Sequence, residues 1–460
     1  MNGSAGFVIK SKGSKTIYVG MFFFSIFADD KIWKIICCCM DKNKLTIRNI
    51  GPLKDVVIDI AKYNVFIGPQ SSGKSCILKI ASFCKWVEKR IELSQSPDKY
   101  LNDDVFWKRL VDFHKLNEFI NDNFLIKYES QHMEFSMYGS PSDIKYVFKW
   151  DTEEKWTYLR PKIAYIPAER NIVAVIPNWF DISFNNKNNT LNYLSDWENA
   201  RSFFSQKNHL EILDLGMSYY YDKENRRESV RVDNEKELLF SNVSSGLQSV
   251  IPLCGIIEYL TLYARAQERR HGVEMKNELE NLENLLYQEK FPYLGGGEFV
   301  LRPEQQSSES SELRAKPFDD YETAKEFDWI LNNYAKTQYT SLYLEEPEEN
   351  LFPSTQYALI KWMAERINLV DDNQIWIATH SPYILSSFNN LIQAAESDNQ
   401  AAETIIGKKS TVPFENINVY SVSNGTVKEI KDNELRLISQ NDLDAVSDII
   451  SSDFSNLISL

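Results

Sequence analysis

The stretch of the chain that decides the fold is a glycine-bounded loop, Gly68-Pro69-Gln70-Ser71-Ser72-Gly73-Lys74-Ser75. It matches the pattern G-x-x-x-x-G-K-[ST] in full. A strand-like run, NVFI, precedes it, and a helix-like run, CILKIASFCKWV, follows it from Cys76. Glycines let backbone N–H groups turn inward around phosphates, and the helix N-terminus adds its positive dipole. The sequence therefore predicts that residues 68–76 bind nucleotide, with Lys74 on the β- and γ-phosphates and the Ser75 hydroxyl on Mg²⁺.

A pair of carboxylates follows a second strand-like run. In SLYLEEPEE, four mostly apolar residues lead to Glu345 and Glu346. Adjacent carboxylates at a strand end can hold the Mg²⁺ shell and orient or deprotonate an attacking water. An acidic pair of this kind is often only a solvated turn. Downstream of a phosphate loop we interpret Glu345 as a metal ligand through a bound water and Glu346 as the catalytic carboxylate.

Two further elements carry polar residues that suit the same chemistry. His380 lies directly after the strand-like run IWIAT, where its ring could contact the γ-phosphate, although a lone histidine is more often structural. Ser244, Ser245 and Gly246 open a long apolar helix and could form a second anion site. Serines at a helix start are also common caps, so this element is weak on its own.

Together these four elements resemble the ATP-binding-cassette (ABC) ATPases of the branch that includes SMC, RecF and OLD-family proteins. GPQSSGKS resembles the Walker A loop, VSSGLQS the signature motif, LYLEEPE the Walker B strand and ATHSPYIL the histidine switch. The resemblance covers most of residues 40–460. It implies an α/β fold of P-loop NTPase type, with a mixed sheet flanked by helices and helical insertions, and with ATP and Mg²⁺ as the bound species.

The resemblance also implies a role for the signature in a second copy of the chain. Ser245, Gly246 and Gln248 would contact the γ-phosphate held by the opposite protomer, so the protein would be a homodimer or a larger even-numbered oligomer. Leu247 departs from the family pattern, which calls for a small or polar residue there. An isolated Q-loop glutamine does not stand out either. The segment IPAERN, residues 166–171, is placed suitably, and Glu169 or Arg170 would contact nucleotide or the interface, or form an ordinary salt bridge.

Composition limits the classes of partner. The 460 residues carry a net charge of −14, which argues against general nucleic-acid binding because phosphate contacts need Lys and Arg. A local basic cluster, Arg265, Arg269, Arg270 and His271, is a candidate DNA contact or a solvated helix face. The six cysteines form no zinc or disulfide pattern, which indicates a reducing cytosol, and no membrane role is expected.

The number of residues between the motifs limits which members of this ATPase group the chain can resemble. Only short helical segments fit between Ser75 and Ser245, which excludes the long arms of SMC proteins, and too few residues follow His380 for the Toprim nuclease domain of OLD proteins. Asp442 and Asp444 are better read as a helix cap and first-turn acid. The chain thus resembles the ATPase subunits of bacterial two-gene anti-phage systems, such as AriA of PARIS or PtuA of Septu. That resemblance implies a sensor or scaffold that controls a separate Toprim or HNH nuclease and responds to a phage protein. A RecF-like DNA-repair ATPase and a nucleotide-locked scaffold are the alternatives.

The organisation of the chain is read as one ATPase head with additions. Residues 1–39, with an apolar run over 17–28, are expected to be a dispensable or mis-called extension, although they also resemble a signal peptide. Residues 44–67 predict two or three strands, and about 90–160 an insertion of helices and antiparallel strands. Residues 181–240 are expected to be polar and partly helical, with a loop over 184–192. A helical insertion spans about 256–335, and its amphipathic segment 272–291 is expected to dock further subunits or an effector, or else to pack on its own chain. A hairpin is predicted at Asn424-Gly425, and a last helix closes the chain.

Overall fold

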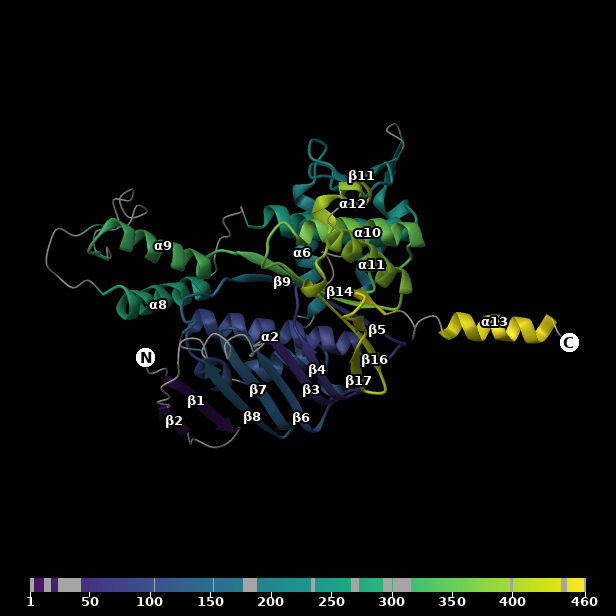
Figure 1. Cartoon of the computed structure of the whole chain (residues 1–460). Helices are drawn as coiled ribbons and strands as arrows, with labels where there is room; N and C mark the ends of the chain where they lie inside the picture. Colours follow the sequence, from purple (N-terminus) through teal and green to yellow (C-terminus); the bar gives the residue numbers. More distant parts are fainter. Residues whose placement is uncertain are drawn as a thin grey trace.

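One large mixed sheet organises the protein. The computed structural model describes residues 4–11, 18–23, 43–102, 104–151, 153–176, 188–232, 236–265, 273–292, 300, 316–397, 400–439 and 445–458. Within this part, 13 strands form a single sheet in the order β2-β1-β8-β7-β6-β3-β4-β17-β16-β5-β15-β14-β9. Figure 1 shows helix α2 beside the antiparallel strands and a group of helices above the parallel ones.

The parallel half of the sheet carries the motifs. Its strands are β5 (Tyr63–Ile67), β9 (Pro161–Ile166), β14 (Tyr339–Glu345), β15 (Gln374–Thr379) and β16 (Ile417–Ser423). β5 pairs in parallel with both β15 and β16, and β14 pairs in parallel with β15 and β9. All of β5 is buried, as expected for a strand covered on both faces. The carboxyl ends of these strands meet at one edge, where ligands bind in open α/β sheets.

The antiparallel half of the sheet is joined to the parallel half through the β16–β17 hairpin, because β17 also pairs with β4. Its strands are β3 (Lys44–Ile50), β4 (Leu53–Asp59), β6 (Ile120–Glu129), β7 (Met133–Ser140), β8 (Asp143–Trp150) and β17 (Thr426–Glu429). β16 and β17 pair across Asn424 and Gly425, both with positive φ, so the predicted hairpin is confirmed. The strands predicted within 44–67 and the antiparallel strands of the 90–160 insertion are confirmed as well.

Two strands come from the predicted N-terminal extension. β1 (Ser4–Ser11) pairs with β8, and β2 (Tyr18–Phe23) pairs with β1, so they lengthen the antiparallel edge. Sheet pairing shows where these residues lie but does not show whether folding needs them. That residues 1–39 are dispensable stays a prediction.

Helices cover the sheet on both faces. α2 (Lys74–Ser94) packs between the antiparallel strands and the parallel ones, and its buried side chains belong to the same core as β3, β6 and β7. The opposite core lies under α6 (Asn189–Phe203), α7 (Ser245–Glu258), α10 (Pro353–Ile367) and α11 (Pro382–Glu396). Phe66 of β5 stacks between the rings of Trp376 and Tyr420, with centroids 5.7 and 5.6 Å away.

Short elements complete the chain. The helical ones are α3 (Asp98–Asn102), α4 (Val105–Lys108), η1 (Arg109–Phe113), η2 (Asn117–Phe119), η3 (Ala168–Asn171), α5 (Ile172–Val175), η5 (Phe240–Asn242), η6 (Tyr259–Tyr263), α12 (Gln400–Ile406), η8 (Lys408–Ser410), η9 (Phe414–Asn416) and α13 (Ala445–Ile458). β18 (Lys431–Asp432) pairs with β19 (Leu437–Ile438). α13 is the predicted last helix, and Figure 1 shows it apart from the other helices.

A small separate sheet corrects one prediction. Residues 181–240 contain not only α6 but also β10 (Leu210–Glu211), β11 (Met217–Asp222), β12 (Arg227–Val232) and β13 (Lys236–Leu239), in that order in an antiparallel sheet. The interpretation of this region as polar and partly helical was therefore wrong over 210–239. Tyr219 and Val230 pack toward Trp197 of α6 in the main core, while charged residues occupy the outer positions. The loop predicted over 184–192 ends earlier, because α6 begins at Asn189, and residues 177–187 lie outside the described part.

The helical insertion forms a hairpin with its own core. α8 (Val273–Lys290) and α9 (Tyr321–Ala335) lie side by side and project from the head in Figure 1. Leu282 and Leu286 of α8 are buried against Phe327 and Tyr334 of α9. The apolar stripe predicted for 272–291 thus covers its own chain, which is the alternative given for this helix.

In the part of the chain that the structure describes, one helical stretch has the length and composition of a membrane span. It runs from Ser245 to Tyr263, and two-thirds of its most apolar window is buried inside the protein. This stretch is the central helix of the core beneath the parallel strands. Cys76, Cys84 and Cys254 are free and buried, and Cys37 to Cys39 lie outside the described residues.

Candidate functional site

The glycine loop connects β5 directly to α2, as the sequence predicts. A Cβ atom at Gly68 would lie 2.3 Å from the carbonyl oxygen of Val422 on β16, so no larger residue fits there. Gly73 caps α2 with φ +106°, and a Cβ there would lie 2.4 Å from the side chain of Leu53. Both glycines are therefore required by close packing, and Gly73 also by its left-handed backbone. Pro69, Gln70 and Ser71 at the tip are exposed, and Ser72 is half-buried.

Lys74 lies inside this loop. Its ammonium donates to the carbonyl oxygens of Gly68 and Pro69, both at 2.8 Å, and the residue is only 5% exposed. Burial lowers the pKa of Lys74 to about 8, against the opposite pull of the Glu346 and Glu348 carboxylates. A desolvated cation at a helix start, ringed by loop backbone, is suited to bind phosphate, because the anion would restore its full charge.

His380 joins Lys74 to the catalytic carboxylate predicted from sequence. The Lys74 Nζ atom lies 3.4 Å from His380 Nδ1, and His380 Nε2 lies 3.5 Å from Oε1 of Glu346. An ammonium can only donate, so Nδ1 accepts and the ring proton is assigned to Nε2, which faces the carboxylate. Lys74, His380 and Glu346 come from the start of α2 and the ends of β15 and β14. The structure therefore brings together three residues that the sequence analysis assigned to one site.

Glu346 has an unusual backbone conformation. Its φ is +44°, and its N–H donates to the carbonyl oxygen of Ala378 at 2.8 Å. A non-glycine residue with this conformation costs on the order of 1 kcal/mol and persists where neighbouring contacts fix it. Glu348, which the sequence analysis did not single out, accepts the His380 backbone N–H at 2.6 Å. Its place in the acidic run EEPEE was the signal available in the sequence.

Glu345 lies next to the start of α2. The Tyr165 hydroxyl on β9 donates to its Oε1 atom, and burial together with this carboxylate raises the pKa of Tyr165. Burial raises the pKa of Cys76 to about 11, and the nearby Glu345 charge adds to that rise. Ser75, beside Cys76, is exposed. A hydroxyl and a carboxylate are the hard oxygen donors that Mg²⁺ prefers, so the residues present fit the ion.

Arg170 of the IPAERN segment is completely buried and lies behind the Walker B turn. Its guanidinium contacts backbone carbonyl groups of residues 345–347 and of α7. The sequence analysis expected a nucleotide contact, an interface contact or a salt bridge. The structure shows an internal group whose ion pair, 3.6 Å to Glu349, is one of several contacts. Glu169 beside it is exposed.

The signature residues lie apart from this cluster. Ser244 and Ser245 are exposed at the start of α7, and the Gln248 amide donates to the Ser241 carbonyl at 2.9 Å. A Cβ at Gly246 would lie 2.8 Å from the Asn350 carbonyl, so the helix start packs closely on the segment after Glu346. Among the described residues, no hydrogen bond or ion pair joins these side chains to the loop that holds Lys74. Their placement leaves Ser244 and Ser245 accessible to another molecule.

The remaining candidates are only partly described. Arg265 is exposed near the end of the stretch that follows η6. Arg269, Arg270 and His271, as well as Asp442 and Asp444, lie outside the described residues.

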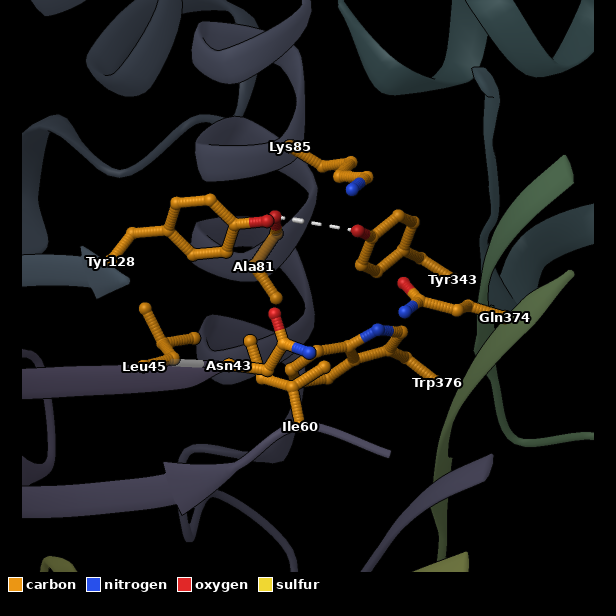
Figure 2. Close-up of a pocket in the computed structure, with 9 residues that line it drawn as sticks. All are labelled: Asn43, Leu45, Ile60, Ala81, Lys85, Tyr128, Tyr343, Gln374 and Trp376. Carbon is orange, nitrogen blue, oxygen red and sulfur yellow. Dashed lines mark hydrogen bonds between the residues drawn. The ribbon is translucent and has the colours of Figure 1, made fainter. Parts of the chain in front are cut away.

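A cavity between α2, β3 and β14 is too small for a nucleotide. It measures about 20 Å³, which is room for roughly one water molecule. Figure 2 shows Lys85, Tyr128, Tyr343 and Trp376 around it, with the Tyr343 hydroxyl donating to the Ala81 carbonyl at 3.4 Å. This cavity is therefore not a candidate nucleotide site, whereas the tip of the glycine loop is exposed.

Comparisons with known proteins give structural neighbours only. No protein-family model matches the chain, and no curated protein sequence matches it. The SMC head domain from Thermotoga maritima is 10% identical and covers 84% of this chain and 97% of its own, with a TM-score of 0.36. An ABC transporter's ATP-binding cassette in its ADP conformation is 10% identical over 86% of this chain and 93% of its own, with a TM-score of 0.30. RecF, a recombination mediator of the RecFOR pathway, is 10% identical over 84% of this chain and 97% of its own, with a TM-score of 0.25. The chain's own glycine loop, which joins buried strand β5 to helix α2 in a mixed sheet flanked by helices, gives it an α/β fold of P-loop NTPase type.

Proposed function

We propose that this protein binds ATP and hydrolyses it to ADP and phosphate. The observation that carries the proposal is the convergence of Lys74, His380 and Glu346 at the glycine loop. Lys74 Nζ lies 3.4 Å from His380 Nδ1, and His380 Nε2 lies 3.5 Å from Glu346 Oε1. A buried cation, a histidine and a carboxylate at the edge of a parallel sheet are suited to phosphoryl transfer to water.

Each residue has a defined task in this reaction. The backbone of residues 68–76 and the Lys74 ammonium hold the phosphates. Ser75 and Glu345 would hold Mg²⁺, which neutralises charge on the phosphate oxygens when bound. Glu346 orients the attacking water and accepts its proton, and the His380 Nε2–H faces that carboxylate and the γ-phosphate position. Tyr165 keeps Glu345 in place through its hydroxyl.

The accessible signature supports an assembly of two copies. Ser245 and Gly246 would meet the γ-phosphate bound by another protomer, so that ATP is sandwiched head-to-tail between two heads. Gln248 is placed one turn into the same helix. The working unit would then be a homodimer or a larger even-numbered oligomer.

The biological role we infer is regulatory. The protein would act in the bacterial cytoplasm as a sensor or scaffold that holds a separate Toprim or HNH nuclease and activates it when a phage protein is detected. The resemblance of EEPEENLFPSTQ and THSPYILSSFNNLI to anti-phage ATPase subunits supports this role. Slow hydrolysis is sufficient for such a conformational switch. The alternative is a RecF-like repair ATPase that binds DNA across its dimer, for which exposed Arg265 is the described candidate contact.

Steady-state ATPase assays with and without duplex DNA test these proposals. Lys74→Ala should lose ATP binding, because the loop loses its countercharge. Glu346→Gln should bind ATP and lose hydrolysis. Lys325→Ala and Glu322→Gln, on exposed positions of α9, are the matched controls and should behave like the wild type.

Each contrary result has a distinct meaning. Unchanged ATP affinity in Lys74→Ala would overturn the site assignment, and wild-type turnover in Glu346→Gln would place the catalytic base elsewhere. ATP binding without turnover in the wild type would favour the nucleotide-locked scaffold. Strong stimulation by DNA would favour the repair ATPase.

A further inference from the structure

We propose that Arg170 is a positioning residue that couples the turn carrying Glu346 to the signature helix α7. The inference rests on the proposed ATPase function and adds a route by which one half of a shared site controls the other. Arg170 lies in η3, directly after β9, and its side chain has no exposed surface.

The guanidinium of Arg170 donates hydrogen bonds from all three of its nitrogen atoms to two structural elements. On the Walker B turn, Nη1 donates to the Glu345 carbonyl at 3.0 Å, and Nη2 to the Glu346 and Pro347 carbonyls at 2.8 and 3.4 Å. On α7, Nε donates to the Ser249 carbonyl at 3.2 Å. Nη1 also lies 3.6 Å from the carboxylate of Glu349, which is an ion pair and not a hydrogen bond. An arginine has five N–H donors in a planar fork, whereas a lysine has three on a single atom.

Burying this cation is costly, so its contacts need an explanation beyond packing. Desolvation lowers the pKa of Arg170, and the Glu349 charge only partly opposes that effect. Ion pairs of buried charges are seldom better for stability than apolar side chains of the same volume. What an apolar residue could not do is hold three consecutive carbonyl groups of one turn and a fourth on a neighbouring helix.

The turn that Arg170 holds is the one that aims the catalytic carboxylate. Glu346 has the left-handed φ of +44°, its N–H is fixed by Ala378, and its carbonyl is fixed by Arg170. These contacts hold the two peptide planes on either side of the Glu346 Cα, which fixes its φ and ψ and therefore the direction in which its side chain leaves the backbone. Loss of the Arg170 contact would let Glu346 relax toward ordinary φ and turn its carboxylate away from His380.

The other end of the link is the signature. Ser249 lies one turn after Ser245 in α7, and the Gly246 backbone packs against Asn350 just beyond the same turn. α7 and the Glu346 turn are therefore tied at two points. Displacement of the α7 start by a second copy's nucleotide would reach Glu346 through these contacts.

Arg170 is itself anchored from a third element. The Tyr193 hydroxyl on α6 donates to the Arg170 backbone carbonyl. The main chain of Arg170 is thus held independently of its side chain. A substitution at this position should therefore change mainly the hydrogen bonds of the guanidinium group.

Arg170→Lys tests the coupling, and Arg201→Lys is its matched control. Arg201 is also buried, with its side chain 5% exposed, but its ion pairs are with Glu198 and Glu228, away from the Walker B turn. We expect Arg170→Lys to lower kcat by at least about tenfold while KM and the affinity for a non-hydrolysed ATP analogue stay within about twofold. Arg201→Lys should lose a similar amount of thermal stability and keep kcat.

A second measurement, amide hydrogen exchange, tests the coupling even if a variant does not fold or the protein does not hydrolyse ATP. Addition of the ATP analogue should slow amide hydrogen exchange over residues 345–351 in the wild type, and Arg170→Lys should lose this protection. If Arg170→Lys does not fold, Glu349→Gln, which removes the ion-pair partner, should lower kcat with KM unchanged. Wild-type kcat in both variants, or equal protection in wild type and Arg170→Lys, would overturn the coupling and leave the ATPase intact. Absence of turnover in the wild type would instead count against the ATPase function, and hydrogen exchange would still decide the coupling.

Discussion

Glu92 predicts a pH dependence of stability that can be worked out from its surroundings. It lies on α2, 4% exposed, and its carboxylate accepts from the Tyr334 hydroxyl at 3.4 Å and from the Gln95 amide at 3.5 Å. Burial, followed by the neighbouring Glu88 charge, raises its pKa to about 8, and the more distant Lys155 opposes this only weakly. Glu92 is therefore protonated at neutral pH in the folded protein and ionised in the unfolded chain.

The sign and the size follow from proton linkage. Because the folded state holds a proton that the unfolded state releases, the contribution is fully present below the unfolded pKa of 4.5 and is lost as pH rises toward 8. Each pH unit inside this window is worth about 1.4 kcal/mol. Between pH 5 and pH 7 the Glu92 carboxyl should therefore lower the free energy of unfolding by roughly 2 to 3 kcal/mol.

Glu92→Gln isolates this contribution. The amide keeps the shape and an acceptor oxygen but cannot ionise, so the variant should gain roughly 2 to 3 kcal/mol relative to the wild type on going from pH 5 to pH 7. Equilibrium urea unfolding at the two pH values, followed by tryptophan fluorescence, measures the difference. Glu322→Gln, exposed on α9, is the control and should show no such change. A constant difference between Glu92→Gln and wild type would refute a protonated Glu92.

Three further predictions concern assembly, the N-terminus and the loop. Ser245→Arg should spare ATP binding but block hydrolysis and ATP-dependent association, because its charge and bulk would sit at the opposing γ-phosphate. Sedimentation with a non-hydrolysed analogue checks this, and a fully active monomer at micromolar concentration would contradict the shared site. A chain starting at Met40 should fold and bind ATP, because the elements that carry the phosphate loop, Glu346 and His380 all lie after Met40; insolubility of that chain would show that β1 and β2 are needed. Gly68→Ala should disrupt nucleotide binding, since its Cβ would meet the Val422 carbonyl at 2.3 Å, whereas Gly216→Ala, with nothing within 4 Å, should cost only about 1 kcal/mol of stability. Equal binding by the two variants would contradict the close packing at Gly68.

The strands that carry the candidate site were predictable because the residues suited to phosphate chemistry directly follow short apolar runs. The loop after β5, the carboxylates after β14 and His380 after β15 each follow a short apolar run. Parallel pairing then brings these strand ends together without further information. The same reasoning predicted the hairpin at Asn424-Gly425, where both residues have positive φ.

Contacts between distant segments could not be predicted in this way. Tyr165 and Arg170 look like ordinary residues of a strand end and a polar turn, and only the pairing of β9 with β14 places them behind Glu345 and Glu346. The small sheet over 210–239 was missed because its strands lack a clear alternation: four successive residues of β11, from Ser218 to Tyr221, are buried. Its outer positions carry charges such as Arg227 and Arg231, which obscure the alternation of a short strand.

The length of helix α2 determines how far a small tilt at the phosphate loop would move the opposite end of the helix. Its 21 residues span about 31 Å in one unbroken rod, from Lys74 at the phosphate loop to the base of the α8–α9 hairpin. At the far end, Arg90 lies 3.4 Å from Glu278 of α8. A tilt of about 5° around the loop would carry that end through roughly 3 Å, half the pitch of a helical turn. A change at the phosphates too small to alter the loop visibly would thus emerge at the hairpin as a displacement large enough to exchange one set of side-chain contacts for another.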